Sequence, residues 1–90
     1  MQSSTGQPLT RTQKLRWYAT QLMSDAAASE KAGSYDSAIS QYLQAADLLL
    51  LLGKVEDNYN AWKQYTDTAA QCQQKARSLI PLASRGEATS

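Results

Sequence analysis

The stretch GSYDSAI at residues 33–39 decides the fold of this 90-residue chain. Gly33 can adopt the left-handed conformation that commonly closes a helix, because it has no side chain to clash. Ser34 is a favoured N-cap residue. Asp36 would lie in the first turn of a following helix, where the helix dipole favours a negative charge. The stretch therefore predicts the joint of an antiparallel helical hairpin.

Two helices are expected on either side of this joint. The first is predicted over residues 11–32, where Thr10 and Gln13 have the spacing of a capping box. The second is predicted over residues 35–52, with Gly53 closing it. Apolar residues recur every three or four positions in both, as in amphipathic helices. The residues expected in the core are Leu15, Tyr18, Leu22 and Ala26 on the first helix, and Ala38, Tyr42, Ala45, Leu49 and Leu52 on the second.

A third helix is expected over residues 57–80, opened by Glu56 or Asp57 and ended by Pro81. Its apolar positions alternate spacings of three and four, as in a bundle helix. They are Trp62, Tyr65, Ala69, Cys72, Ala76 and Leu79.

Three helices with two short connections predict an all-α fold, an antiparallel up-down-up three-helix bundle over residues 11–81. Residues 1–10 are rich in polar residues and are expected to form a flexible N-terminal tail. Residues 82–90 are small and polar and are expected to begin a linker.

The composition excludes several classes of protein. Nine basic and eight acidic residues argue against a generic nucleic-acid binder or a binder of acidic membranes. The longest apolar run, residues 48–52, is far shorter than the roughly 20 residues of a membrane span. A polar N-terminus and a single cysteine favour a soluble, cytoplasmic module without a secretory signal.

No catalytic pattern is present in the sequence. The chain lacks histidine, and its four glycines are isolated, so neither a common general base nor a phosphate-binding loop is available. Cys72 has no partner at the spacing of a zinc site and is expected to be a small buried hydrophobe. We therefore expect no enzyme activity, no metal and no cofactor in these residues.

Two apolar surfaces could bind a partner. On the second helix, Ile39, Leu43, Ala46 and Leu50 form a stripe offset by about 100° from the core stripe. This stripe either packs against a neighbouring helix or forms the floor of a groove beside the third helix. Among the five successive leucines of residues 48–52, Leu51 is expected to face water.

The first and third helices supply the other flanks of these surfaces. Ala19 and Met23 are expected beside the core stripe of the first helix, where Met23 either fills a gap or makes an adaptable contact. On the third helix, the flank that contains Ala70, Gln73 and Arg77 is either a solvated face or a ligand contact. Three basic residues lie where the dipole of the first helix disfavours them, so they attract an acidic partner or the helix begins later. They are Arg11, Lys14 and Arg16.

The pattern EKAGSYDSAIxxYxxA over residues 30–45 resembles two known families. One is the tetratricopeptide repeat. The other is the MIT domain (microtubule-interacting and trafficking), a single three-helix bundle. Repeat arrays need further copies with a period near 34 residues. No second joint of this kind follows in the sequence, and the third helix is long, so the MIT domain is favoured over residues 15–82.

This resemblance implies an adaptor that binds short C-terminal tails of ESCRT-III-like proteins in the grooves between its helices. It implies contact with endosomal membranes only through partners, and a parent protein such as an AAA ATPase or a protease. By position, Met23 matches an apolar groove residue of the family, whereas Gln73 replaces a leucine and Arg77 replaces an acidic residue. These departures favour an extended, proline-containing ligand on the side of Met23, or a ligand of different charge.

The residues expected to contact the tail are Ala19, Met23, Ile39, Leu43, Leu50, Ala70, Gln73 and Arg77. The alternative function is structural: a tetratricopeptide-like or bundle element that packs in a scaffold or dimerises through residues 48–52.

Overall fold

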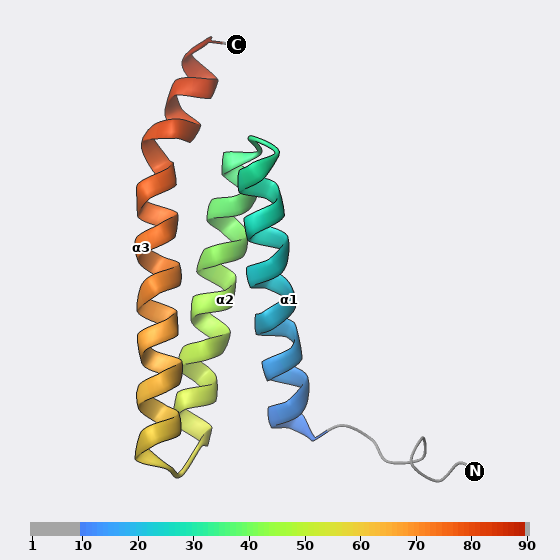
Figure 1. Cartoon of the computed structure of the whole chain (residues 1–90), viewed down its shortest axis with the longest axis vertical. Helices are drawn as coiled ribbons and strands as arrows, with labels where there is room; N and C mark the ends of the chain where they lie inside the picture. Colours follow the sequence, from blue (N-terminus) through green and yellow to red (C-terminus); the bar gives the residue numbers. More distant parts are fainter. Residues whose placement is uncertain (1–9, 90) are drawn as a thin grey trace, which may run out of the picture.

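A computed structural model describes residues 10–89 of the chain, with side chains described as far as residue 85. It contains three helices, α1 (Arg11–Lys31), α2 (Tyr35–Val55) and α3 (Tyr59–Thr89), and no strand in this part of the chain. Successive helices run in opposite directions (Figure 1). The predicted all-α, up-down-up three-helix bundle is therefore confirmed. α2 packs closely along both α1 and α3, whereas the backbones of α1 and α3 hardly approach each other.

The joint between α1 and α2 has the expected geometry. Gly33 has a φ of 82°, in the left-handed region. Its amide donates to the carbonyl of Glu30 (3.1 Å), and the amide of Ser34 donates to that of Ser29 (2.8 Å), which together form a Schellman motif. Ser34 occupies the N-cap position of α2, although its side chain makes no capping hydrogen bond.

The capping box that was predicted at the start of α1 is present. Thr10 Oγ1 accepts from the Gln13 amide (3.1 Å), and Gln13 Oε1 accepts from the Thr10 amide (2.8 Å). α1 therefore begins at Arg11, and the alternative of a later start for this helix is wrong. The rest of the expected N-terminal tail, residues 1–9, lies outside the described residues.

The predicted boundary between α2 and α3 is wrong by a few residues. α2 continues to Val55, and Gly53 lies inside it, buried. A Cβ on Gly53 would lie 3.3 Å from Trp62 Cδ1, so this glycine allows α3 to pack close to α2 and does not end the helix. Asn58 precedes α3, with its Oδ1 accepting from the Ala61 amide (3.2 Å), where Glu56 or Asp57 had been expected to open the helix.

The predicted end of α3 is also wrong, because Pro81 lies inside a helix that continues to Thr89. A proline has a φ compatible with a helix and removes one hydrogen bond, so it can bend a helix without ending it. Leu82 packs against the core and holds the helix beyond the proline. Figure 1 shows α3 extending past the joint of α1 and α2 and changing direction there. Residues 82–89 are therefore helical and do not form the expected linker.

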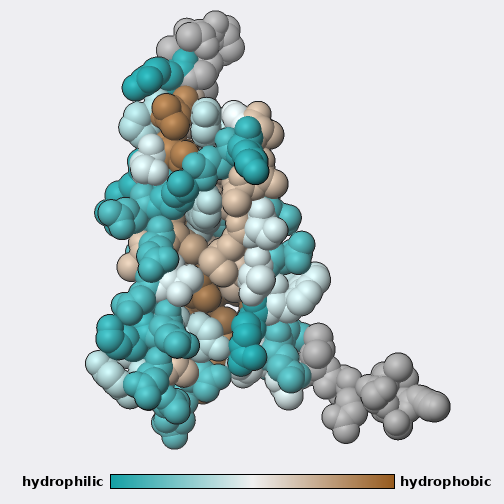
Figure 2. Space-filling view, viewed as in Figure 1, coloured by the Kyte–Doolittle hydropathy of each residue, from teal (hydrophilic) through white to brown (hydrophobic). Residues whose placement is uncertain are grey.

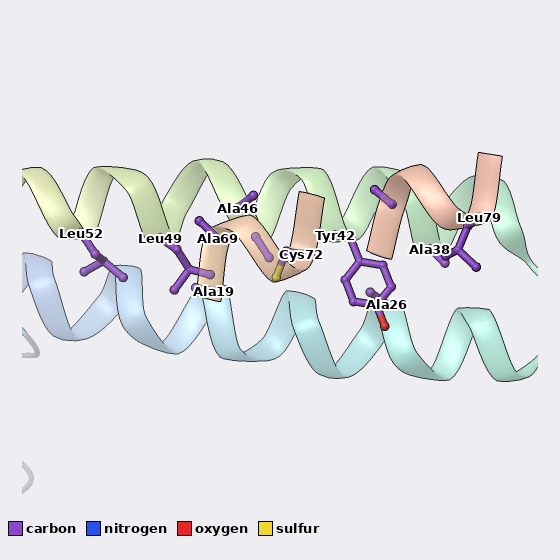
Figure 3. Close-up of a cluster of buried hydrophobic side chains, with 12 residues drawn as sticks. Ala19, Ala26, Ala38, Tyr42, Ala46, Leu49, Leu52, Ala69, Cys72 and Leu79 are labelled. Atoms are coloured by element: carbon purple, nitrogen blue, oxygen red, sulfur yellow. The ribbon is translucent and has the colours of Figure 1, made fainter. Parts of the chain in front are cut away.

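The core is thin because it is built largely from alanine (Figure 3). All five α2 residues expected in the core are buried. Tyr18 and Trp62 are exposed, contrary to expectation, and Ala19, which is 1% exposed, takes the core position on α1. Seven of the twelve buried hydrophobic residues are alanines, which lets the helices approach closely. The twelve are Ala19, Ala26, Ala38, Tyr42, Ala45, Ala46, Leu49, Leu52, Ala69, Cys72, Ala76 and Leu79.

Substitution of Gly33 by alanine is expected to lower the free energy of unfolding by about 1–2 kcal/mol, because a Cβ disfavours the left-handed conformation. No neighbouring atom lies within 4 Å of that Cβ, so the loss would come from the backbone alone. Gly33→Asn is the matched control, since asparagine tolerates this conformation better. Urea denaturation measures both variants, and equal losses would contradict this explanation.

Candidate functional site

A groove runs between α1 and α3, over α2. Because α1 and α3 stay apart, the side chain of Leu49 on α2 reaches the bottom of a cleft of about 430 Å³, and Met23 of α1 lies on its wall. Figure 2 shows apolar atoms along the middle of this face, with hydrophilic side chains on both sides. The cleft is lined by Arg16, Thr20, Met23, Leu49, Gln64, Tyr65, Asp67 and Thr68.

Arg16 bridges one end of this groove. Its Nε donates to Tyr65 Oη of α3 (3.1 Å), and its Nη2 lies 4.0 Å from Glu56 Oε2 in the connection after α2. More than half of the Arg16 side chain is exposed, so the ion pair adds little stability. It does give Arg16 a partner inside the molecule, which the sequence did not reveal.

Glu30 lies about two turns of α1 beyond Met23, outside the lining of the cleft, and joins all three helices. Its Oε1 accepts from Tyr42 Oη of α2 (3.1 Å), and its Oε2 lies 3.0 Å from Lys75 Nζ of α3. Burial raises the pKa of Tyr42, and the hydrogen bond to Glu30 and the charge of Glu30 act in the same direction. The phenol is therefore held neutral, as the donor that this carboxylate needs.

The second apolar stripe of α2 is partly buried against the other helices and partly accessible, so each of the two predicted roles applies to some of its residues. Ala46 is fully buried in the core, and Ile39 packs partly against it. Leu43 and Leu50 are 44% and 36% exposed, so they remain accessible on the flank of α2. Leu50 follows Leu49 and points about 100° away from it, so this stripe does not share the groove of Met23.

The flank of α3 that was predicted beside this stripe is largely exposed. Ala70 and Arg77 are exposed, and Gln73 is half-buried. In the run of leucines, Leu50 is exposed while Leu51 is half-buried, so the expectation that Leu51 would face water is wrong. Five successive leucines point around the whole helix, and which one reaches water depends on where α1 and α3 lie.

The structure separates the predicted contact residues into three groups. Ala19 is 1% exposed and belongs to the core, so it cannot contact a ligand. Met23 lies in the α1–α3 groove. The remaining six lie on the flanks of α2 and α3: Ile39, Leu43, Leu50, Ala70, Gln73 and Arg77.

Most of the residues that define the groove were not predicted to contact a ligand. Tyr65 and Leu49 were predicted only as core residues, and Glu30 and Lys75 received no role. Their contacts join residues 45–49 positions apart on different helices, so no helical spacing within the sequence indicates them. The unfavourable place of Arg16 near the start of α1 was the one signal available.

The described residues offer little for catalysis. They contain no group of three or more histidine, cysteine, aspartate or glutamate side chains that could hold a metal ion. Cys72 is buried, and burial raises the pKa of its thiol, which keeps it in the unreactive protonated form. None of the helices in residues 10–89 combines the length and apolarity needed to cross a membrane.

Comparisons with known proteins found no matching family, no matching curated protein and no matching solved structure. The likeness to MIT domains therefore rests on the residues of the α1–α2 joint and on the length of α3.

We expect Tyr42→Phe to lower the free energy of unfolding by about 1 kcal/mol, because the hydrogen bond to Glu30 is lost while the ring remains packed. Tyr35→Phe is the matched control, because Tyr35 also packs against the core but does not bond to Glu30. Thermal unfolding of both variants checks this. A Tyr42→Phe protein as stable as the wild type would show that Glu30 does not join α1 to α2.

The thiol of Cys72 should react with a disulfide reagent at least about tenfold more slowly in the native protein than in urea, because it is buried and protonated. The measurement is the rate at which the reagent releases its own thiol on reaction with Cys72 at neutral pH. Equal rates in both conditions would mean that the core between α2 and α3 opens freely.

Proposed function

We propose that this bundle is an MIT-like adaptor that binds C-terminal tails of ESCRT-III-like proteins in the groove between α1 and α3. The observation that carries the proposal is the position of Met23 above Leu49, in a cleft with polar walls between α1 and α3. A flexible methionine beside a fixed leucine suits an apolar side chain of a peptide. The chemistry of the groove supports binding and offers nothing for a reaction.

The distance between the two bridges suits an extended peptide. The two bridges begin at Arg16 and Glu30 on the same helix, so they are about 21 Å apart at 1.5 Å per residue. An extended chain covers that distance in about six residues.

The polar walls of the groove can bind a peptide backbone. The hydroxyls of Thr20 and Thr68 already donate to carbonyls of their own helices, at 2.9 Å each. Their oxygen lone pairs remain as acceptors, which peptide amides can use. Arg16, Lys75 and Asp67 carry charges along this face, and each is already paired within the molecule, with Glu56, Glu30 and Lys63 respectively.

The flank between α2 and α3 supports this function less well. Leu43 and Leu50 are accessible there, but Gln73 and Arg77 leave the opposite side polar. In the proposal, the adaptor recruits its parent protein, for example an AAA ATPase or a protease, to membrane-remodelling filaments in the cytoplasm or on endosomes.

The alternative of dimerisation through residues 48–52 has little support, because most of these five leucines pack inside the bundle. Leu49 and Leu52 are buried in the core, and Leu48 packs against it. These leucines are already used within one bundle.

Titration with tail peptides of ESCRT-III proteins, followed by NMR, tests the proposal. We expect shifts at residues around Met23 and a Kd of about micromolar, typical of a short peptide. Met23→Asp should weaken binding at least about tenfold, because a charge would be placed against the apolar part of the ligand.

Leu43→Asp is the matched control, since Leu43 is accessible on the other flank and its substitution leaves the groove intact. If Leu43→Asp abolishes binding and Met23→Asp does not, the peptide occupies the α2–α3 flank. If no tail peptide produces shifts, the adaptor function is wrong and the structural alternative gains support.

A further inference from the structure

Exposed aromatic side chains gather at the end of the bundle where the cleft of Met23 lies, but none of them lines that cleft. Trp17, Tyr18, Tyr59 and Trp62 are 56%, 55%, 69% and 44% exposed. They form two pairs: Trp17 and Tyr18 meet edge to face with ring centroids 5.2 Å apart, and Tyr59 and Trp62 are 5.7 Å apart. The exposed Val55 precedes the second pair. Trp62 packs partly against Gly53, and the remaining surface of these rings faces solvent.

The two pairs lie at the same end of the bundle. In Figure 1 the start of α1 and the turn between α2 and α3 are at the same end. Arg16, next to Trp17, contacts Glu56 and Tyr65, which flank the second pair in the sequence. We name this region the aromatic end, and it consists of Trp17, Tyr18, Val55, Tyr59 and Trp62.

The charge at this end is positive although the whole chain is nearly neutral. Residues 10–23 and 48–67, which form this end, contain five basic and three acidic residues, whereas residues 24–47 and 68–85 contain four of each. No acidic residue precedes Asp25 in the chain, so the exposed Arg11 and Lys14 beside the first aromatic pair have no acidic neighbour on their own turns of helix.

We propose that the aromatic end binds directly to the surface of a bilayer that contains anionic lipids. Tryptophan and tyrosine prefer the interface between headgroups and hydrocarbon, because each combines an apolar ring with a polar group. Lysine and arginine near them are attracted by the negative surface potential. The rings and the basic residues share one end, which allows both to act together at the membrane surface.

This contact differs from the peptide groove and does not depend on it. Met23 and Leu49 form the groove wall and floor, and none of the five residues of the aromatic end lines that cleft. A bundle bound in this way would keep the groove free for a ligand. Direct lipid contact departs from two expectations: the resemblance implied membrane contact only through partners, and the net charge argued against a generic binder of acidic membranes.

Sedimentation with vesicles tests the proposal on the full 90-residue chain. Vesicles of phosphatidylcholine with phosphatidylserine should bind the protein at least about tenfold more strongly than phosphatidylcholine alone, and added salt should weaken binding because it screens the charges. Both tryptophans of the chain belong to the aromatic end, so their fluorescence should shift to shorter wavelength on binding.

The double substitution Trp17→Ser with Tyr18→Ser should weaken vesicle binding about tenfold or more, because two interfacial rings are lost. Ile80→Ser is the matched control, since Ile80 is an apolar residue 49% exposed in the C-terminal half of α3. Circular dichroism checks that both variants remain folded.

The proposal is overturned if anionic vesicles neither sediment the protein nor shift its fluorescence, or if Ile80→Ser weakens binding as much as the double substitution. It is also overturned if a soluble acidic peptide produces the same fluorescence shift while vesicles do not, since the aromatic end would then be a protein contact. Tail-peptide binding measured on the same variants is expected to be unchanged, which separates this test from that of the groove.

Discussion

The close packing of α2 against both of its neighbours is the constraint on which the rest of the structure depends. Alanines at the contacts allow the backbones to approach, and Gly53 does the same where α3 begins. Because α2 occupies the space between them, α1 and α3 are held apart. The groove above Leu49 therefore follows from the positions of the alanines and Gly53 at the helix contacts, which place α2 between the other two helices.

Polar contacts then define the two ends of this groove. Arg16 and Glu30, both on α1, reach across to Tyr65 and Lys75 on α3. These exposed or half-exposed pairs contribute modestly to stability, but they fix the lateral distance between helices that are not packed against each other. A ligand in the groove would thus meet a preformed site with Met23 and Leu49 in the middle and polar side chains along the walls, which lowers the entropic loss on binding.

The groove and the exposed aromatic rings use different residues at the same end of the bundle. The groove follows the line between α1 and α3, while the aromatic end lies around the start of α1 and the turn after α2. This arrangement would let one small domain contact a lipid surface and a protein tail at the same time. Each contact alone would be weak, and two together would raise the effective concentration of the second ligand.

The sequence by itself determined the helices, the joint at Gly33, the capping box and the core face of α2, because these depend on interactions between residues close in the chain. The helix ends predicted at Gly53 and Pro81 were wrong, because whether such residues end a helix depends on what packs beside them. Trp62 lies against Gly53, and Leu82, directly after Pro81, packs against the core. Only the tertiary structure decided that Ala19 is buried and that Arg16 and Glu30 bridge the groove. Contacts between helices join residues far apart in the chain. Their positions depend on how the three helices pack around one thin core, and the spacing of residues within a single helix does not predict that packing.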